Sequence, residues 1–550
     1  MTEIPHGLSG IRRQIMWNRL LAVVEEHAQT LLRTAFSYIV RESGDLSAGV
    51  FDLQGHMLAQ AVTGTPGHVN SMAESVRHFI EAFPTQSMAE GDVYCTNNPW
   101  KGTGHLNDMV VTTPAFHRGR LVGLFSCTSH LVDLGGIGFG PDGTDVFMEG
   151  LHLPFLKLVD RGRVNDTLMQ IVKANTRLPV ETEGDIYSLI NCNEIGCRRL
   201  SEMMAEFDLS TLDDLSAHIL ESSRAAVLAE IAKLPKGSWR YEMTIDGYDA
   251  PITLAASTTI SGDAVRIDFA GTSPAARFGI NSPLAYTTAY SVFGLSCAVA
   301  PRVPNNAGSL SAYGVTAPPH TIVNALAPAP VALRHLIGQM LPDVVFGCLR
   351  QAMPDRVPAE GTSCIYLMTF RGRDAEPERR FAISVVTNGG TGARPGKDGL
   401  SATAYPSGVK GTPVEIVETT TPLLFWRKEF RPDSGGPGTQ RGGHGLELEI
   451  ENRSPAPIEI LAAFDRTKFP PRGCDGGRPG RPAYLGLKAA GKQLEGKGLQ
   501  EIPAGERLVL HTPGGGGLGA PHRRDAAAIA ADRKNGLVSP DSARADYGVE

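Results

Sequence analysis

Two histidines and one aspartate between positions 105 and 130 have the types and spacing of metal ligands. His105 stands three residues before Asp108 in a segment rich in glycine and asparagine, and His130 follows the next apolar run. Two imidazoles and one carboxylate suit Zn²⁺, Mn²⁺ or Fe²⁺ and leave coordination positions free for water or substrate. The sequence therefore predicts a divalent metal site at these three residues. The alternative for such a pattern is a chance arrangement of surface or hydrogen-bonded side chains.

A β-hairpin has to bring the three predicted ligands together. The segments 109–116 and 121–127 are both apolar and β-rich, and the residues Arg118 and Gly119 between them are a turn signal. Two such runs joined by a short polar turn are typical of antiparallel strands. We therefore expect a hairpin over this part of the chain.

The register of the hairpin decides which residues face one another. A turn centred between positions 118 and 119 predicts that Asp108 faces Ser129 and that Asn107 faces His130. Facing residues lie about 4.5–5.5 Å apart at Cα, which is close enough for their side chains to share an ion. His105, Asp108 and His130 are therefore expected together at the open mouth of the hairpin.

Polar residues around this segment are candidates for substrate contact or proton transfer. For each of them, a structural role as a polar group in a loop is an equally good explanation. Asp133 is a spare carboxylate that suits a hydrogen-bond partner of a ligand better than a ligand. The candidates are His68, Asn97, Lys101, Asp133 and Glu149.

Charge and composition exclude several classes of protein. The net charge is −6 and no basic block occurs, which argues against nucleic acid as a partner. The apolar runs fall short of the 18 or more residues of a membrane span, and the N-terminus shows no signal peptide. The eight cysteines form no CxxC pair and are expected to be reduced thiols. These features predict a cytoplasmic protein that does not enter a membrane.

The order of the expected elements predicts an α+β fold with several domains and mostly antiparallel sheets. Helical periodicity covers 11–42, 71–83, 165–234, 283–298, 332–352 and 523–534, and the segment 361–512 is mostly β. A chain of 550 residues is long enough for three or four domains. The expected regions are an N-terminal helix-hairpin-helix region (1–90), a metal-site hairpin with a helical segment (91–235), an α+β domain (236–360), a β-rich domain (361–520) and a C-terminal helix with its tail (521–550).

Glycine makes up 62 of the 550 residues, about 11% where about 7% is usual. Gly514, Gly516 and Gly519 match G-x-G-x-x-G, but too little chain follows to build a dinucleotide fold. The segment 389–397 fails as a phosphate-binding loop, and no nucleophilic serine elbow occurs. No nucleotide site is therefore predicted in this chain. The glycine-rich segments favour tight turns over phosphate binding, and the arginines there that could bind an anion are Arg394, Arg431 and Arg441.

Many short motifs in a fixed order resemble those of one family. The chain resembles the hydantoinase B/oxoprolinase family, the smaller catalytic subunit or C-terminal half of ATP-dependent hydantoinases, 5-oxoprolinases and the acetone and acetophenone carboxylases. The resemblance runs almost from end to end. The motifs that carry it are Ser43-Gly44-Asp45, 92–108, 129–136, Glu149-Gly150-Leu151, 174–177 with 183–185, 268–273, 281–283, 389–399, 431–436 and 512–517.

The resemblance implies that His105, Asp108 and His130 bind the metal. It also implies a larger, hydantoinase A-type partner that binds ATP and phosphorylates a substrate carbonyl oxygen, so that the two chains work as a hetero-oligomer. The metal would then act as a Lewis acid or hold an attacking hydroxide or enolate. One departure is Leu131, which stands where members often carry a second histidine, and the less polar context of Asp133 leaves its role open.

The function implied by the resemblance is hydrolysis of a hydantoin, N-methylhydantoin or 5-oxoproline-type lactam, with this chain as the metal-dependent catalytic subunit. A first alternative is a biotin-independent, ATP-dependent carboxylase of a ketone such as acetone or acetophenone. A second alternative is a non-catalytic scaffold that completes the active site of the partner. A dehydrogenase built on the terminal glycine motif is a remote third alternative.

Overall fold

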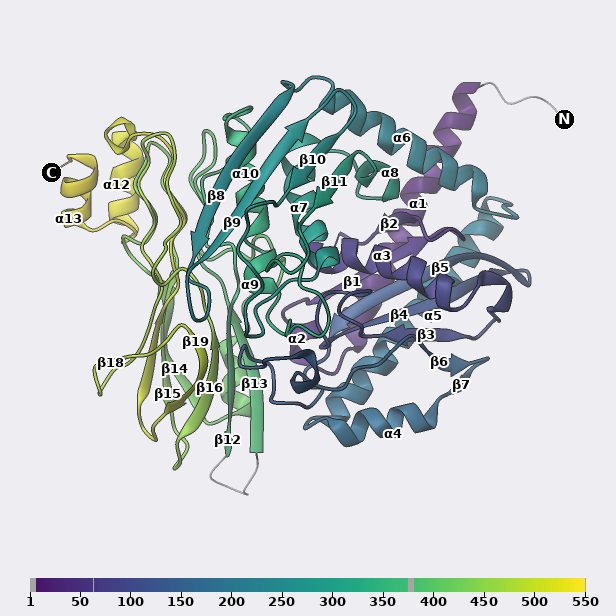
Figure 1. Ribbon diagram of the computed structural model, residues 1–550, viewed down its shortest axis with the longest axis horizontal. Coiled ribbons are helices and arrows are strands. Elements are labelled where there is room, and N and C mark those ends of the chain that lie inside the picture. The colour runs from purple at the N-terminus through teal and green to yellow at the C-terminus, as the bar shows by residue number, and fades with distance from the viewer. Residues whose placement is uncertain (1–5, 63, 374–379, 550) are drawn as a thin grey trace.

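The computed structural model describes residues 6–62, 64–373 and 380–549, and its elements alternate between helices and four sheets (Figure 1). The predicted α+β fold with mostly antiparallel sheets is confirmed. Among the described helices, none combines the length and apolar character needed to cross a membrane. The first five residues, on which the expectation about a signal peptide partly rests, lie outside the described residues.

The N-terminal part of the chain builds a seven-stranded antiparallel sheet. Its central strands are buried on both faces, because helices cover both sides. The order across the sheet is β2 (Met57–Gln60), β1 (Leu46–Phe51), β5 (Arg120–His130), β4 (Asp108–His117), β3 (Val93–Thr96), β6 (Leu156–Asp160) and β7 (Arg163–Val164).

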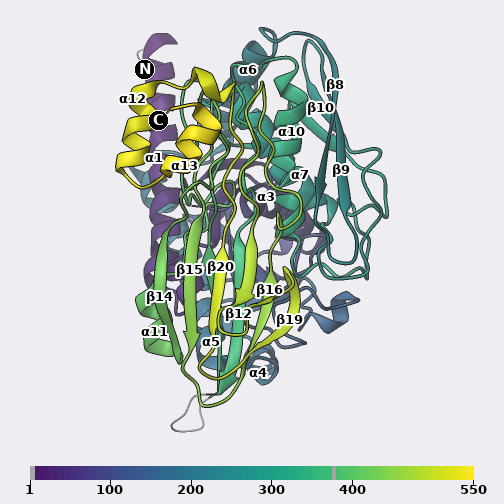
Figure 2. The same cartoon turned by 90° about the vertical axis from the view of Figure 1, so that its left-hand side faces the viewer.

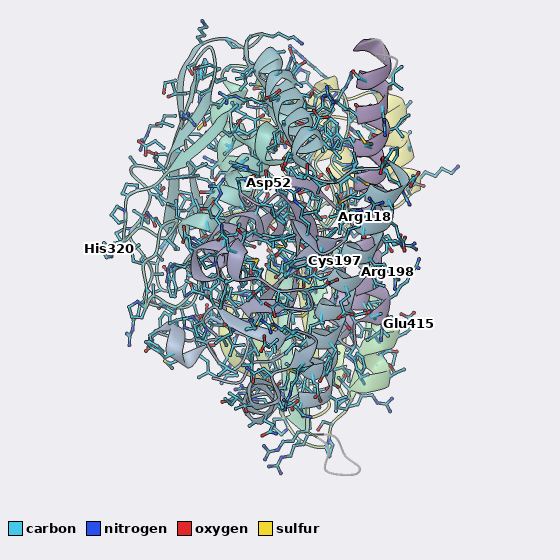
Figure 3. The ribbon with its side chains drawn as sticks, turned by 90° about the vertical axis from the view of Figure 1, so that its right-hand side faces the viewer. Asp52, Arg118, Cys197, Arg198, His320 and Glu415 are labelled. Atoms are coloured by element: carbon cyan, nitrogen blue, oxygen red, sulfur yellow. The ribbon has the colours of Figure 1, made fainter. Side chains whose placement is uncertain are left out.

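Two groups of helices cover this sheet. Alternate residues of a strand point to opposite faces, and Val111 and Phe125 belong to the core of one face while Val110 and Leu124 belong to that of the other. The first face packs on α5 (Pro179–Glu206) and the second on α3 (Pro66–Ala82). Figure 3 shows the molecule from the side of α1 (His6–Thr34) and α5, with Cys197 and Arg198 marking α5. The remaining helices of this part are α2 (Tyr38–Arg41), α4 (Asp166–Asn175) and α6 (Asp213–Ile231).

The helix expected over 11–42 is interrupted after Thr34. The backbone N–H groups of Phe36 and Ser37 donate to the Asp185 carboxylate at 2.8 and 3.0 Å instead of continuing the helical ladder. Gly184 makes room for this contact, since a Cβ there would lie 2.2 Å from the Phe36 ring. A side chain distant in sequence therefore ends α1.

The hairpin forms with its turn at Arg118 and Gly119, but the predicted register is wrong by one residue near the open end. His117 pairs with Arg120 as expected, yet Asp108 pairs directly with His130. A bulge at Val122 causes the shift, because Ala115 pairs with Gly123 while Phe116 pairs with Leu121. The extra residue turns Asp108 and His130 into cross-strand neighbours.

The middle of the chain forms a four-stranded sheet whose helices lean on the N-terminal part. α7 (Leu284–Val299) packs between α3 and α10 (Leu341–Arg350), and α10 covers two strands of this sheet. β10 and β11 form the parallel pair, and the other pairs are antiparallel. The order is β11 (Tyr313–Thr316), β10 (Val265–Asp268), β9 (Ile252–Ile260) and β8 (Gly237–Ile245), and the short helices are α8 (Ala307–Leu310) and α9 (His335–Gly338).

Two antiparallel sheets dominate the C-terminal part, as predicted, and their strands run alongside one another in Figure 2. One has the order β13 (Arg380–Thr387), β12 (Tyr366–Arg373), β16 (Ile458–Ala463) and β19 (Lys497–Ile502). The other has the order β14 (Leu423–Phe430), β15 (Leu446–Asn452), β20 (Arg507–His511), β17 (Tyr484–Leu487) and β18 (Lys492–Gln493). The helices are α11 (Val414–Thr420), α12 (Ala526–Lys534) and α13 (Pro540–Ser542), and single turns lie at Thr85–Ser87, Val146–Met148, Pro521–Arg523 and Ala543–Tyr547.

The glycine-rich segments pack backbone against backbone beyond the ends of these sheets. Gly443 N donates to Thr391 O, and Gly515 N donates to Gly443 O, both at 2.9 Å. A Cβ on Gly442 would lie 1.9 Å from Gly515 O, so only glycine fits there. The terminal G-x-G-x-x-G segment belongs to this bundle, which accounts for part of the glycine surplus.

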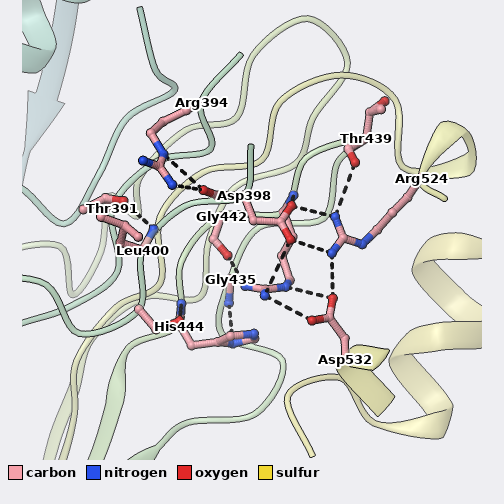
Figure 4. Close-up of polar contacts among 12 residues, drawn as sticks. Thr391, Arg394, Asp398, Leu400, Gly435, Thr439, Gly442, His444, Arg524 and Asp532 are labelled. Atoms are coloured by element: carbon pink, nitrogen blue, oxygen red, sulfur yellow. Dashed lines mark hydrogen bonds and ion pairs between the residues drawn. The ribbon is translucent and has the colours of Figure 1, made fainter. Parts of the chain in front are cut away.

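An ion-pair network ties this bundle to α12 (Figure 4). Arg524 donates to both oxygens of Asp398 at 2.7 Å and to Asp532 at 2.7 Å. The arginines considered for anion binding are engaged inside the protein. Arg441 pairs with Asp532, Arg394 donates to the carbonyl oxygen of Asp398, and Arg431 donates to that of Pro482.

Candidate metal centre

Asp108 is the centre of a buried cluster at the start of β4. Its side chain is fully buried, and its Oδ1 atom lies 2.7 Å from Nε2 of His105 and 3.2 Å from Nδ1 of His130. These three residues offer ligand atoms that all lie within 4.8 Å of one another. The structure therefore brings the three predicted ligands together, with the bulge supplying the last step of the alignment.

The contact between His105 and Asp108 fits a shared cation. Nδ1 of His105 donates to the carbonyl oxygen of Ala332 at 2.8 Å, which leaves a lone pair on Nε2. That Nε2 atom is buried and makes no hydrogen bond, although it lies 2.7 Å from the carboxylate oxygen. Two acceptor atoms at this distance repel one another unless a cation lies between them. The donor set thus suits a divalent metal.

Burial sets the protonation state of His105. Removal from water, together with the positive charge of Arg334, lowers the pKa of His105 to about 3. The ring is therefore neutral at physiological pH, which is the form that binds a metal. The protein pre-sets the ligand state.

Arg334 and His68 occupy the other oxygen of Asp108. Nη2 of Arg334 lies 2.5 Å from Oδ2, and its Nε donates to Thr103 O at 2.8 Å. The guanidinium also lies over the Tyr286 ring, 4.2 Å from the ring centre. Nε2 of His68 lies 2.9 Å from the same Oδ2. Because Oδ2 is held in this way, Oδ1 faces the two candidate ligand histidines.

The environment of His68 differs from that of His105. Burial opposes its charged form, but the carboxylates of Asp108 and Asp45 outweigh burial and raise the pKa of His68 above its usual value. Nδ1 of His68 lies 3.5 Å from Oδ1 of Asp45. His68 therefore holds a proton more firmly than a free histidine.

A small cavity opens beside the cluster, and a fourth imidazole lines it. His335 is 3% exposed, and its Nε2 atom has no hydrogen-bond partner. Burial and the charge of Arg334 hold the pKa of His335 well below its usual range. Phe139 covers the rings of His105 and His130, with centroids 5.6 and 4.7 Å away. The cavity is lined by Asp45, Thr65, His68, His105, His130, Phe139, Tyr286, Arg334, His335 and Gln339, among others.

The other predicted polar residues lie outside this cluster. Asp133 pairs with Arg177 at 2.5 Å and accepts a hydrogen bond from Thr176. The Lys101 side chain is exposed. Asn97 donates to Leu106 O and accepts from Leu153 N, so it fastens the loop before the hairpin.

Glu149 lies next to the cluster and touches it through the backbone. Its Oε1 atom accepts hydrogen bonds from the N–H groups of Val331 and Ala332 at 2.6 and 2.8 Å. The carbonyl oxygen of Ala332 in turn accepts the hydrogen bond from His105. Glu149 therefore positions the backbone that orients one candidate ligand.

Sequence reasoning missed several residues of the site. Asp45 lies in the Ser43-Gly44-Asp45 motif and could have been found there. Arg334, His335 and Tyr286 had no local signal, because they lie more than 150 residues from the hairpin in sequence. Their proximity to Asp108 arises from the packing of α7 and α9 on the N-terminal part.

The fold and the site together define a mixed α+β protein with a buried histidine–aspartate cluster beside a cavity. The chain belongs to the hydantoinase B/oxoprolinase family, whose model matches residues 9–521. It is 28% identical to the smaller chain, named B, of a putative D-/L-hydantoinase of Pseudomonas sp. (strain NS671), over 98% of this chain and 94% of that one.

Solved structures agree with this assignment. The ATP-dependent caprolactamase from Pseudomonas jessenii matches with a TM-score of 0.90 and 26% identity, over 98% of this chain and 96% of that one. A nucleotide-free acetone carboxylase matches with a TM-score of 0.87 and 19% identity, over 98% of this chain and 80% of that one. At that identity the second likeness shows the fold alone.

Proposed function

We propose that this chain is the metal-binding subunit of an ATP-dependent cyclic amidase, which opens hydantoin-, N-methylhydantoin- or 5-oxoproline-type lactams together with a larger ATPase subunit. The observation that carries the proposal is the 2.7 Å approach of two acceptor atoms, Nε2 of His105 and Oδ1 of Asp108, inside the protein. The likeness to a caprolactamase along nearly the whole chain supports a cyclic amide as substrate.

His105, Asp108 and His130 would hold the metal ion. When bound, the ion would act as a Lewis acid and lower the pKa of a bound water towards about 7. Arg334 keeps the Asp108 carboxylate ionised and oriented through their direct contact. Ala332 keeps the His105 ring in the tautomer whose Nε2 atom is free. The first task of the chain's own residues is thus to fix the ligand atoms before substrate arrives.

Proton transfer falls to the two other buried histidines of the cavity. His335 is neutral, and its unpaired Nε2 atom can accept a proton. His68 lies between Asp45 and Asp108 and retains its proton, so it is suited to donate one. An acid and a base on the same cavity are what ring opening of an amide requires, because the leaving nitrogen must be protonated.

The ATP-dependent step belongs to the partner. A stable amide carbon is a poor electrophile, and phosphorylation of its carbonyl oxygen by a hydantoinase A-type subunit would activate it. The relative from Pseudomonas jessenii is the beta chain of a caprolactamase, which supports a second, different chain as the partner of this one. The two chains would then divide activation and ring opening between them.

The test is an assay of the purified complex of this chain with its larger ATPase subunit. Lactams of the hydantoin, 5-oxoproline and caprolactam types are supplied with ATP and Mg²⁺, and ketones are supplied in parallel with ATP and bicarbonate. We expect ring opening coupled to ATP hydrolysis, and loss of ring opening in His105→Ala. His117→Ala is the matched control, since His117 lies at the other end of β4 and contacts Ser201.

Two results would overturn the proposal. Formation of a carboxylate from a ketone, without lactam turnover, would assign the complex to the carboxylases. Full lactam turnover by the His105→Ala complex would make this chain a scaffold.

A further inference from the structure

A second cluster of metal-ligand side chains lies on the opposite face of the hairpin from the candidate metal centre. Cys127 of β5, Cys192 of α5 and His27 of α1 are each fully buried. Two sulfurs and one ring nitrogen lie within 4.8 Å of one another, and the two sulfurs are 3.4 Å apart. Cys127 and His130 differ by an odd number of positions along β5, so their side chains point to opposite faces. The two clusters are therefore separate.

The hydrogen bonds of Asn193 determine which nitrogen of His27 faces the thiols. The amide Nδ2 of Asn193 donates to Val111 O at 3.0 Å and to Thr113 Oγ1 at 3.1 Å, so its Oδ1 is an acceptor. Nε2 of His27 lies 2.7 Å from this oxygen and must donate to it. The lone pair is then on Nδ1, which is buried and has no hydrogen-bond partner. A buried acceptor without a partner is costly and indicates a missing ligand.

The distances between the donors suit one bound ion. Two sulfurs that each lie about 2.3 Å from a tetrahedral zinc ion are about 3.8 Å apart, so the observed 3.4 Å needs only a small adjustment. The carbonyl oxygen of Leu189 lies 3.4 Å from Cys127 Sγ and 3.2 Å from Cys192 Sγ and adds an oxygen donor. Three side chains and one carbonyl thus surround a common point.

Charge balance selects the kind of ion. Two thiolates and a neutral imidazole carry a charge of −2, which a divalent ion cancels and a monovalent copper ion does not. A net charge in so buried a place is strongly disfavoured. Sulfur and imidazole donors favour Zn²⁺ over Mg²⁺, Ca²⁺ or Mn²⁺.

We propose that His27, Cys127 and Cys192 form a structural Zn²⁺ site through Nδ1 and the two Sγ atoms. Binding converts both thiols to thiolates and releases two protons to solvent, with no change of oxidation state. Because the ligands come from α1, β5 and α5, the ion ties both helices to the strand that carries His130. The ion enters while the chain folds, since the finished site is closed to water.

Cobalt reports on this site without interference from the first one. The full chain is produced with Co²⁺ in place of Zn²⁺, and its near-ultraviolet spectrum is recorded. We expect a thiolate-to-cobalt charge-transfer band, because only the second cluster offers sulfur. The band and one equivalent of metal should be lost in Cys192→Ser and retained in His105→Ala. Cys95→Ser is the matched control, since Cys95 is an equally buried thiol on β3 of the same sheet.

Zinc X-ray absorption of the wild-type chain keeps the proposal testable if the cysteine variants fail to fold. A sulfur shell at about 2.3 Å is the expected result. Zinc bound only through nitrogen and oxygen would overturn the proposal. Titration of thiols in denaturant without reductant, after metal removal, should find all eight cysteines. Two missing thiols would indicate a disulfide between Cys127 and Cys192 and would likewise overturn it.

Discussion

Nη2 of Arg334 lies 2.5 Å from Oδ2 of Asp108 and joins two residues that are 226 positions apart in the chain. Both side chains are buried, at 3% and 0% exposed, so neither charge is solvated by water. Removal of one partner of such a pair leaves the other uncompensated, at a cost of about 3–5 kcal/mol. The arginine is therefore essential to the charge and the orientation of the central carboxylate.

The first prediction concerns Arg334→Met. We expect a loss of stability of about 3–5 kcal/mol, because the buried Asp108 carboxylate loses its cation. Metal affinity should fall about 10–100-fold, because Oδ1 is no longer held towards the histidines. Urea unfolding and metal titration measure the two effects. Arg427→Met is the control, since its ion pair with Glu447 is largely exposed. An effect of Arg334→Met no larger than that of the control would contradict the assigned role.

The second prediction concerns the candidate ligand His130. His130→Ala should lose one equivalent of bound divalent metal, because the imidazole nearest Asp108 across the strands is removed. Metal analysis of the purified chain measures this loss. His117→Ala changes a histidine of the same hairpin, at the turn end, and should keep the full metal content. Equal metal content in both variants would exclude His130 as a ligand.

The third prediction is a pH dependence that originates at Glu149. Burial raises the pKa of Glu149 from 4.5 to about 8, so the folded protein keeps a proton there that the unfolded chain releases. The free energy of unfolding contributed by this group therefore falls as the pH rises from about 4.5 to about 8. The slope is at most about 1.4 kcal/mol per pH unit.

Glu149→Gln tests this dependence, since glutamine keeps the oxygen that accepts from Val331 and Ala332 but cannot ionise. Urea unfolding of both proteins across this pH range should show the variant gaining stability relative to the wild type as the pH rises. A constant difference between the two would mean that Glu149 does not titrate in this window.

The fourth prediction concerns Gly104. Its φ of +97° is one that other residues rarely adopt, and a Cβ would lie 3.0 Å from Nε of Arg334 and from Cβ of Tyr286. Gly104→Ala should therefore displace Arg334 and weaken metal binding, with a stability loss of about 1–3 kcal/mol. Gly119→Ala is the control, because Gly119 also has a positive φ but open space around it. Unchanged metal affinity in Gly104→Ala would show that Arg334 tolerates the shift.

Local patterns predicted much of the scaffold. The apolar spacing of Leu20, Val24 and Leu31 predicted α1, and all three are fully buried. The turn at Arg118 and Gly119 was predicted by residue type, because positive φ angles favour glycine there. The bulge was not predictable, since any strand of β-branched residues can absorb one extra residue and only packing decides where.

The chain's own sequence determined the family, the hairpin and the identity of His105, Asp108 and His130 as candidate ligands. All of these depend on residues close together along the chain. Tertiary structure alone decided that Arg334 neutralises Asp108, that Glu149 orients His105 through a backbone carbonyl, and that His27 meets two cysteines. Such contacts depend on how helices and sheets distant in sequence pack together, and burial then gives them their strength, because charges and lone pairs removed from water must find partners within the protein.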